Sequence, residues 1–207
     1  MASLDPSLAE LFKAKAAPVG TIVAETEGLD QALDYALNIC RQKDNCELLL
    51  AGGDEKSVIH DGRVRRSAAK ILAAPELAEA RFAELAEAGA ARGITVIRDG
   101  LREHLAGLEV GFSLADLAVA ETATAVLACP GEEARLSAMI CETHIIAVPK
   151  SKIVETSYQA EDYLRDIMGG IMYAAFISGC SRTSDIERVL TLGVHGPLEL
   201  HVVLMNT

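Results

Sequence analysis

The chain has 207 residues, of which half are hydrophobic and only 4% aromatic, and it carries a formal net charge of −11. This length suits one domain with a full hydrophobic core, and the acidic balance argues against nucleic acid or an anionic membrane as a partner, because phosphates need nearby cations. The five cysteines lack the CxxC spacing of zinc and iron–sulfur sites, so we expect no metal and no cofactor.

The N-terminal half predicts helices that alternate with short apolar strands. Its first residues lack the apolar segment of a secretory signal, and no run in the chain reaches the ~18 apolar residues that cross a bilayer. We therefore expect a cytoplasmic protein with no membrane span. Asp5 and Pro6 predict the N-cap and the first position of a helix over 5–15, within an N-terminal helical extension, 1–18. The next expected elements are a strand over 21–24, a helix over 28–42, a buried strand over 47–51, an irregular stretch over 54–74 with a partial helix over 68–73, a helix from 75 to 93 and a strand over 94–97.

The C-terminal half continues this alternation. Expected here are strands over 117–120, 125–128, 145–148 and 198–204, and a helix over 158–177 that is interrupted or closely packed at Gly169 and Gly170. Short strands between helices predict βαβ units, and hence an α/β fold with a mainly parallel sheet and right-handed crossovers. The chain shows no internal repeat and no long linker, so residues 1–207 are expected to form a single domain.

Glu121 is the first candidate for a functional residue. It follows the apolar strand over 117–120 and begins the segment Glu121-Thr122-Ala123-Thr124. Open α/β sheets bind ligands at the carboxyl ends of their strands, so a carboxylate here could bind a hydroxyl, act as a general base or attack an activated acyl group. The alternative is structural, with Glu121 capping a neighbouring helix or pairing with an arginine.

A second candidate segment runs from Gly179 through Cys180, Ser181, Arg182 and Thr183 to Ser184, Asp185 and Glu187. Ser184 and Glu187 have the spacing of a capping box, which predicts that a helix begins here. Backbone amides at such a helix start bind anions, and Arg182 could hold a carboxylate or phosphate through two hydrogen bonds. The alternative is that Ser184 and Asp185 only cap the helix while Arg182 pairs with Asp185 or Glu121.

His195 lies in a glycine-rich turn before the last strand, where it could act as an acid, a base or a ligand, or serve only as a structural hydrogen-bond donor. The other histidines show no metal-ligand spacing, and His201, within the last apolar strand, is expected in the core. The sequence contains no Walker A loop, GxSxG elbow, HExxH motif or GxGxxG fingerprint. Nucleotide hydrolysis, α/β-hydrolase chemistry, zinc proteolysis and ordinary Rossmann dehydrogenation are therefore disfavoured.

These segments resemble the signature of the LUD-domain family. The resemblance rests on Gly179 to Glu187, on Gly193-Val-His-Gly-Pro197 with the following Leu-His-Val-Val-Leu strand, and on Val110 to Asp116 with Ala120 to Thr124. It is specific over 108–204, and in size the chain is closest to the lactate-utilization protein C type. Two positions depart from the family pattern, because Ala123 replaces a glycine and Cys180 replaces a proline. If that glycine has a positive φ, Ala123 would alter the loop.

The resemblance implies a Rossmann-like fold similar to the NagB/RpiA/CoA-transferase superfamily. It also implies a role in oxidising L-lactate to pyruvate together with partner proteins that carry iron–sulfur clusters. A ligand-binding subunit of such an assembly is the preferred hypothesis. Glu121 and His195 would be its catalytic residues, and a small carboxylate or other anion would be bound by Thr122, Thr124, Ser181, Arg182, Thr183, Asp185 and Gly196.

This hypothesis requires Glu121 and Arg182 to face one another across one cleft. Whether the chain is itself an enzyme stays open. The alternatives are a non-catalytic scaffold for the iron–sulfur partners, or an acyl- or CoA-transferase-like enzyme with Glu121 as nucleophile, which rests on fold analogy alone. The high apolar content also allows a homo-oligomer.

Overall fold

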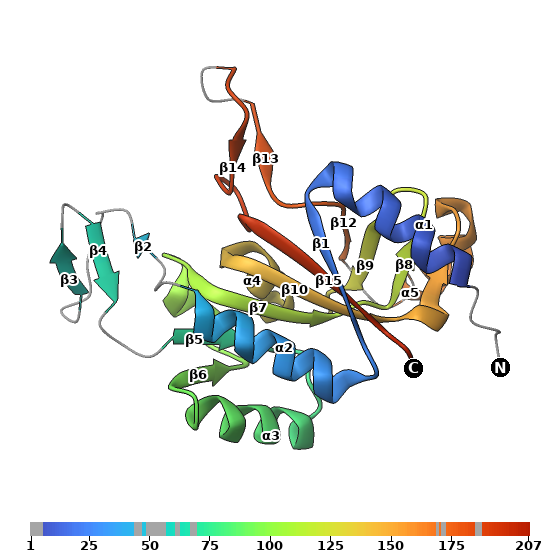
Figure 1. Cartoon of the computed structure of the whole chain (residues 1–207). Coiled ribbons are helices and arrows are strands. Elements are labelled where there is room, and N and C mark those ends of the chain that lie inside the picture. The colour runs from blue at the N-terminus through green and yellow to red at the C-terminus, as the bar shows by residue number, and fades with distance from the viewer. Residues whose placement is uncertain are drawn as a thin grey trace.

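The computed structural model of the chain describes residues 6–43, 47–48, 57–60, 63–66, 70–168, 170, 173–184 and 188–207. A six-stranded sheet in the order β1-β15-β10-β7-β5-β6 forms its centre, and every neighbouring pair in it is parallel (Figure 1). This arrangement confirms the predicted α/β fold with a mainly parallel sheet. The six strands are β1 Thr21–Thr26, β5 Lys70–Ala73, β6 Ile94–Ile97, β7 Leu108–Leu114, β10 Cys141–Pro149 and β15 Glu199–Met205.

Helices α2 (Leu29–Gln42) and α3 (Glu79–Ala90) cover one face of the central sheet (Figure 1). The apolar residues of α2 recur every three or four positions, so one stripe of this helix faces the sheet. Leu37 on that stripe and Phe112 on β7 are almost completely buried in the same apolar cluster. Each such side chain contributes about 1.5–3 kcal/mol through its burial, which holds α2 on this face.

A second, four-stranded sheet packs against the opposite face. It has the order β11-β8-β9-β12, in which β8 and β9 form an antiparallel hairpin and β12 pairs antiparallel with β9. Helix α1 (Pro6–Ala16) joins this side through Phe12, which is fully buried among residues of both sheets. The strands of the second sheet are β8 Leu117–Val119, β9 Thr124–Ala128, β11 Ile153–Val154 and β12 Ala174–Ile177.

The remaining helices flank these two sheets. Helix α4 (Glu132–Ile140) contacts β7 and β10, and α5 (Glu161–Met168) covers the outer side of the second sheet. In the described part of the chain, four short 3₁₀ helices connect the larger elements: η1 Ala17–Val19, η2 Leu101–His104, η3 Lys150–Lys152 and η4 Ser157–Ala160. Among the described residues, no helix combines the length and the apolar character that a membrane span requires.

Two small antiparallel units complete the described structure. Strands β13 (Arg182–Thr183) and β14 (Thr191–Leu192) form a hairpin that projects away from the sheets (Figure 1). The second unit is a three-stranded sheet in the order β2-β4-β3. Its strands are β2 Glu47–Leu48, β3 Ser57–His60 and β4 Arg63–Arg66.

Several predictions of local structure were wrong. Residues 70–73 form strand β5 of the central sheet instead of a partial helix, and 174–177 form β12 instead of the end of a helix. In both cases a short, alanine-containing apolar run fits either structure, and pairing with a neighbouring strand decides between them. The predicted strand over 47–51 is described only as β2, which pairs antiparallel with β4 outside the central sheet. The helix expected from Pro75 begins at Glu79.

The helix predicted to begin at Ser184 is also absent from the described part of the chain. Thr183 pairs with Thr191 and Arg182 with Leu192, so the residues that directly precede Ser184 belong to an antiparallel hairpin. The amides that were predicted to bind an anion belong to residues 185–187, so anion binding by them stays a prediction. Residues 185–187, which include Asp185 and Glu187, lie outside the described residues.

Candidate functional site

A cavity of about 400 Å³ lies between the central sheet, α4, β12 and two loops. His144 on β10 and Leu200 on β15 line it from the sheet, Arg135 and Met139 line it from α4, and residues 173–177 form a wall along β12. The loops 178–181 and 195–197 complete the lining. Ligand cavities in proteins have volumes of this order, which makes this the candidate site.

Close packing of α4 on the sheet positions the wall that carries Arg135. Gly111 of β7 lies beside His144 of β10 in the sheet register. A Cβ atom at Gly111 would overlap the carbonyl oxygen of Ser137 on α4. The missing side chain therefore lets α4 approach the sheet, and a larger residue at Gly111 would push the helix and its cavity-facing side chains outward.

His144 is the most deeply buried polar group of the site. Its side chain is 0% exposed, and its Nε2 lies 2.9 Å from the hydroxyl oxygen of Ser113. Its Nδ1 is buried and has no hydrogen-bond partner among the described residues. Burial lowers the pKa of His144 to about 3, so the imidazole is neutral at physiological pH.

The two loops bring three predicted site residues together. Ser181, His195 and Gly196 all line the cavity. The Ser181 amide donates a hydrogen bond to the Pro197 carbonyl at 2.9 Å, and a Cβ atom at Gly196 would lie 3.2 Å from the Ser181 Cβ. The absence of a side chain at Gly196 thus allows the close approach of the two loops.

The charge of the cavity is opposite to that of the chain. Among the described residues that line it, Arg135 is the one Lys or Arg side chain, and none is Asp or Glu. The Arg135 guanidinium lies 5.4 Å from the centre of the Tyr173 ring and forms no salt bridge within the described part of the chain. In a protein of net charge −11, a cavity-lining arginine that forms no salt bridge with the described carboxylates favours the binding of an anion.

Cys129 is a buried thiol in the lining of the cavity. Burial raises the pKa of the Cys129 thiol, which lines the cavity, to about 11, so it is protonated and a weak nucleophile at neutral pH. The described residues contain no cluster of three or more His, Cys, Asp or Glu side chains that could hold a metal ion.

Thr122 and Thr124 lie behind the loop at 178–181, outside the cavity lining. Their hydroxyl oxygens are 2.7 Å apart, and that of Thr124 is 2.6 Å from the hydroxyl oxygen of Ser178. These hydrogen-bonded hydroxyl groups connect the start of β9 to the loop that carries Ser181. Ala123 between them has φ +50°, so this alanine keeps the left-handed conformation that we considered for the family's glycine.

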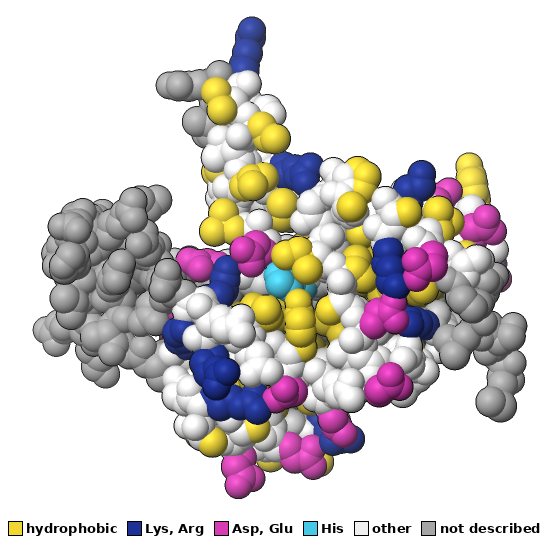
Figure 2. All heavy atoms as spheres, in the orientation of Figure 1, with side chains coloured by type: hydrophobic (Ala, Val, Ile, Leu, Met, Phe, Trp, Pro, Cys, Tyr) yellow, Lys and Arg dark blue, Asp and Glu magenta, His cyan; other side chains and the backbone are white. Residues whose placement is uncertain are grey.

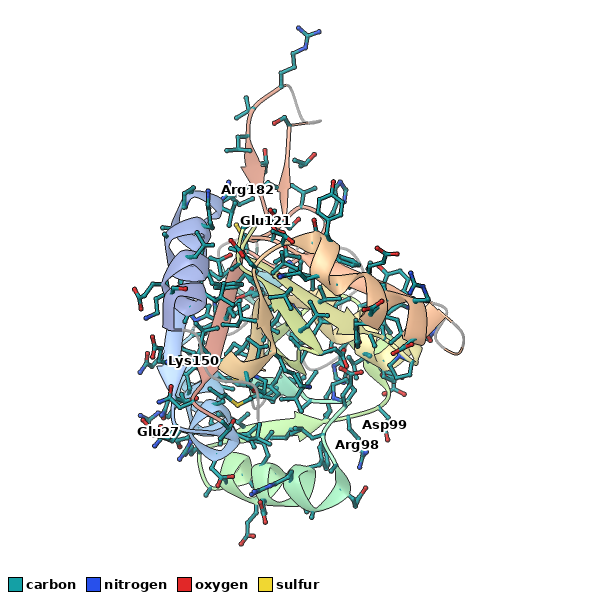
Figure 3. The ribbon with its side chains drawn as sticks, turned by 90° about the vertical axis from the view of Figure 1, so that its right-hand side faces the viewer. Glu27, Arg98, Asp99, Glu121, Lys150 and Arg182 are labelled. Carbon is teal, nitrogen blue, oxygen red and sulfur yellow. The ribbon has the colours of Figure 1, made fainter. Side chains whose placement is uncertain are left out.

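Glu121 and Arg182 lie at the same end of the molecule, near the base of the β13–β14 hairpin (Figure 3). The Glu121 Oε1 accepts hydrogen bonds from the Ser157 amide at 2.7 Å and the Ser157 hydroxyl at 3.0 Å. The exposed Arg182 guanidinium lies next to Gly20. Both residues are described, and no salt bridge joins them. Neither they nor Thr183 line the cavity, so their place in one cleft stays a prediction.

The sequence reasoning did not single out Arg135 or His144. Helix α4, which carries Arg135, was not predicted, although Glu132 and Glu133 in its first turn are typical of a helix start. His144 immediately precedes the apolar run over 145–148, and a polar residue at the edge of a buried strand was the one available signal.

Comparison with known proteins adds independent information. The LUD domain matches residues 9–205. Proteins named lactate utilization protein C are similar over part of the chain: that of Bacillus velezensis is 36% identical over 101 residues (47% of this chain and 42% of that protein), and that of an Exiguobacterium species is 37% identical over 110 residues (51% and 47%). The chain thus spans less than half the length of these relatives. The crystal structure of a DUF162 family protein from Deinococcus radiodurans has a TM-score of 0.59 at 18% identity and covers 97% of both chains, which supports the fold.

Proposed function

Because this chain belongs to the LUD domain family, we propose that it is a component of an L-lactate utilization system and that its cavity binds a small carboxylate or another small anion. The names of the relatives support the system, and the lining of the cavity supports the ligand. The single observation that carries the ligand is the unpaired Arg135 in a cavity lined by no described carboxylate.

The oxidation of lactate to pyruvate requires an electron acceptor, and the described residues offer no metal cluster site. In this proposal, the chain acts in the cytoplasm with iron–sulfur partner proteins that take the electrons, while it holds the acid. Arg135 binds the carboxylate, and Ser181, His195 and Gly196 contact the ligand from the loops. Glu121, Thr122, Thr124, Arg182, Thr183 and Asp185 are proposed to support these loops or to extend the site toward a partner.

Binding of L-lactate and pyruvate to purified variants tests the anion site. Loss of a charge-assisted hydrogen bond costs about 1.5–3 kcal/mol, so Arg135→Gln should weaken binding about 10- to 100-fold. Arg81→Gln on α3 is the matched control, because it removes the same charge from the opposite face of the central sheet. Isothermal titration calorimetry would measure each dissociation constant.

The same titrations separate the two arginines. Equal affinity of the wild type and Arg135→Gln for these acids would show that the cavity is not the anion-binding site. Equal affinity of the wild type and Arg182→Ala would remove Arg182 from ligand binding and restrict it to a structural or partner-binding role. A loss in Arg182→Ala alone would place the ligand at the hairpin base, as the sequence first predicted.

A scaffold function, with or without self-association, is the second candidate, and the β13–β14 hairpin favours it. Val189, Leu190 and Leu192 in this hairpin are 61%, 63% and 47% exposed, and Figure 2 shows the hydrophobic side chains along the projection. Exposed apolar clusters are typical of protein interfaces. Leu190→Glu should then reduce binding to the iron–sulfur partners, or dissociate a homo-oligomer, in light-scattering measurements. Unchanged association in both assays would refute this role.

A further inference from the structure

The cavity runs along an open edge of the second sheet. Strand β12 is the last strand in the order β11-β8-β9-β12, so β9 is its one neighbouring strand among the described residues. Alternate side chains of a strand point to opposite faces, yet all five residues from Tyr173 to Ile177 line the cavity. A cavity on one face would be lined by every second residue, so this cavity follows the free edge of β12.

The pairing of β12 with β9 fixes which backbone groups face this edge. The Cys129 amide donates a hydrogen bond to the Tyr173 carbonyl at 3.0 Å. Hydrogen-bonded and non-hydrogen-bonded pairs alternate along antiparallel strands, so the backbone groups of Ala175 also face β9. Those of Ala174 and Phe176 face away from β9, and no described backbone group pairs with them. The edge therefore offers two amides and two carbonyls to a further strand.

The composition of β12 favours pairing with another strand. Exposed edge strands of soluble proteins usually carry charges or prolines that prevent such pairing. Strand β12 has the sequence Ala-Ala-Phe-Ile and carries neither. Phe176 is 50% exposed, Tyr173 before the strand is 44% exposed, and Met139 on α4 across the cavity is 55% exposed. Exposed apolar side chains around an unpaired strand edge are typical of a groove that binds an extended peptide.

The charge of the cavity selects the end of the peptide that lies in it. Arg135 lies at the Tyr173 end of β12, where its guanidinium is 5.4 Å from the centre of the ring. A strand added antiparallel to β12 runs from the loop at 178–181 toward Arg135, so its carboxyl end arrives at the guanidinium. A parallel strand would bring its amino end there and be repelled. Since no Asp or Glu is among the described lining residues, the cavity complements a terminal carboxylate.

We propose that the cavity binds the carboxyl-terminal segment of a partner protein as an extended strand, which pairs antiparallel with the free edge of β12 and places its terminal carboxylate at Arg135. This proposal rests on the anion site of the proposed function, because Arg135 holds the carboxylate in both. Strand β12 has four residues, which at about 3.3 Å each span about 13 Å, so a peptide of about five residues covers it. A small acid in the same cavity competes with the peptide for Arg135.

Two peptides that differ only at the terminus test the carboxylate. The probe is Lys-Thr-Val-Thr-Val with a free carboxylate, its comparison is the same peptide with a terminal amide, and fluorescein on the lysine reports binding by fluorescence anisotropy. The free acid should bind the wild type about 10-fold more tightly than the amide, because the amide forms no charge-assisted hydrogen bond with Arg135. Arg135→Gln should bind both peptides with equal affinity, while the control Arg81→Gln should keep the difference.

N-methylation of the peptide tests strand addition. Every second amide of an added antiparallel strand faces β12. Methylation of one of these amides should weaken binding about 10-fold, whereas methylation of the next amide should change it by less than about three-fold. Ala174→Pro removes an outward-facing amide, which an edge strand tolerates, and should weaken peptide binding with L-lactate affinity within about two-fold of the wild type. Circular dichroism would establish that this variant is folded, and the methylated peptides decide the matter on the wild type even if it is not.

The outcomes separate this inference from the proposed function. Equal affinity for the acid and the amide, or an equal effect of adjacent N-methyl groups, would overturn the inference, and lactate binding that depends on Arg135 would still support the proposed function. Peptide binding without lactate binding would support the inference and refute the small-acid ligand. Absence of binding by the peptides, lactate and pyruvate would refute the anion site itself. Self-association that Phe176→Glu abolishes would place a second copy on the β12 edge and overturn the peptide.

Discussion

Gly179 connects the cavity loop to the N-terminal part of the fold, and its replacement by alanine provides a quantitative test of that connection. Its φ is +84°, in the left-handed region, and a Cβ atom there would overlap the carbonyl oxygen of Val19. Gly179→Ala therefore adds two costs, a backbone strain and a steric clash with main chain that cannot rotate away. Cys180 and Ser181 follow directly and line the cavity.

Gly93 is a matched control that separates these two costs. Its φ is +73°, and a Cβ atom there would meet no atom within 4 Å. Alanine in this conformation costs about 1–2 kcal/mol, of which about 0.4–1 kcal/mol is offset because alanine restricts the unfolded chain. Gly93→Ala should therefore lower the free energy of unfolding by about 1 kcal/mol.

Gly179→Ala should cost more by the energy of the clash. Forcing additional atoms into a packed region costs about 1–3 kcal/mol, so the total loss should be about 2–4 kcal/mol. Urea unfolding followed by circular dichroism would measure both variants, with the loss taken from the midpoints at a common slope. Gly179→Ala should also weaken acid binding, while Gly93→Ala should not.

Equal losses of stability in the two variants would refute the reasoning. Such a result would mean that the loop is not held against Val19, or that it moves away without cost. The cavity loop would then be free to open independently of η1, and the position of Ser181 could not be attributed to the Gly179 contact.

Three further predictions concern His144, Cys180 and Ala123. His144 takes up a proton near pH 6.5 in the unfolded chain and only near pH 3 in the folded chain. The free energy of unfolding should therefore fall as the pH drops below 6.5, by about 2 kcal/mol at pH 5. Urea unfolding at several pH values should show that His144→Gln removes this part of the pH dependence. In a Cys46→Ser background, a thiol reagent should modify Cys180 first, because the other three cysteines are buried, and a bound acid should slow the reaction. Ala123→Gly should change stability by less than about 1 kcal/mol, because relief of the left-handed strain offsets the lost buried methyl and the more flexible unfolded chain.

The fold was predictable where the apolar pattern was long and regular. The helix expected over 28–42 is α2, and the strand expected over 198–204 lies within one residue of β15 at each end. The pattern failed where four to seven residues were apolar throughout, as in β5 and β12, because such a run has no period that separates strand from helix. The pairing partner decides these cases, and a partner distant in sequence leaves no local signal.

The candidate site was predictable only in its loops. The glycine and polar residues around Ser181 and His195 stand out in the sequence because they interrupt apolar elements, and the structure brings them to one cavity. Arg135 and His144 come from a helix and a strand whose own patterns look ordinary. Their importance follows from what is missing around them, a carboxylate partner for the arginine and a hydrogen-bond partner for Nδ1, and only coordinates can reveal such absences.

The position of the cavity explains why the sequence pointed to a different edge of the sheet. Parallel α/β sheets usually bind ligands beyond the carboxyl ends of their strands, and that rule led to Glu121. In this chain β8, which precedes Glu121, belongs to the second sheet, while His144 and Leu200 lie in the amino-terminal halves of β10 and β15. The cavity therefore lies on a face of the central sheet, in the space that α4 and β12 leave between them. A ligand there would contact both sheets at once, so its binding should stabilise their packing and raise the free energy of unfolding with ligand concentration.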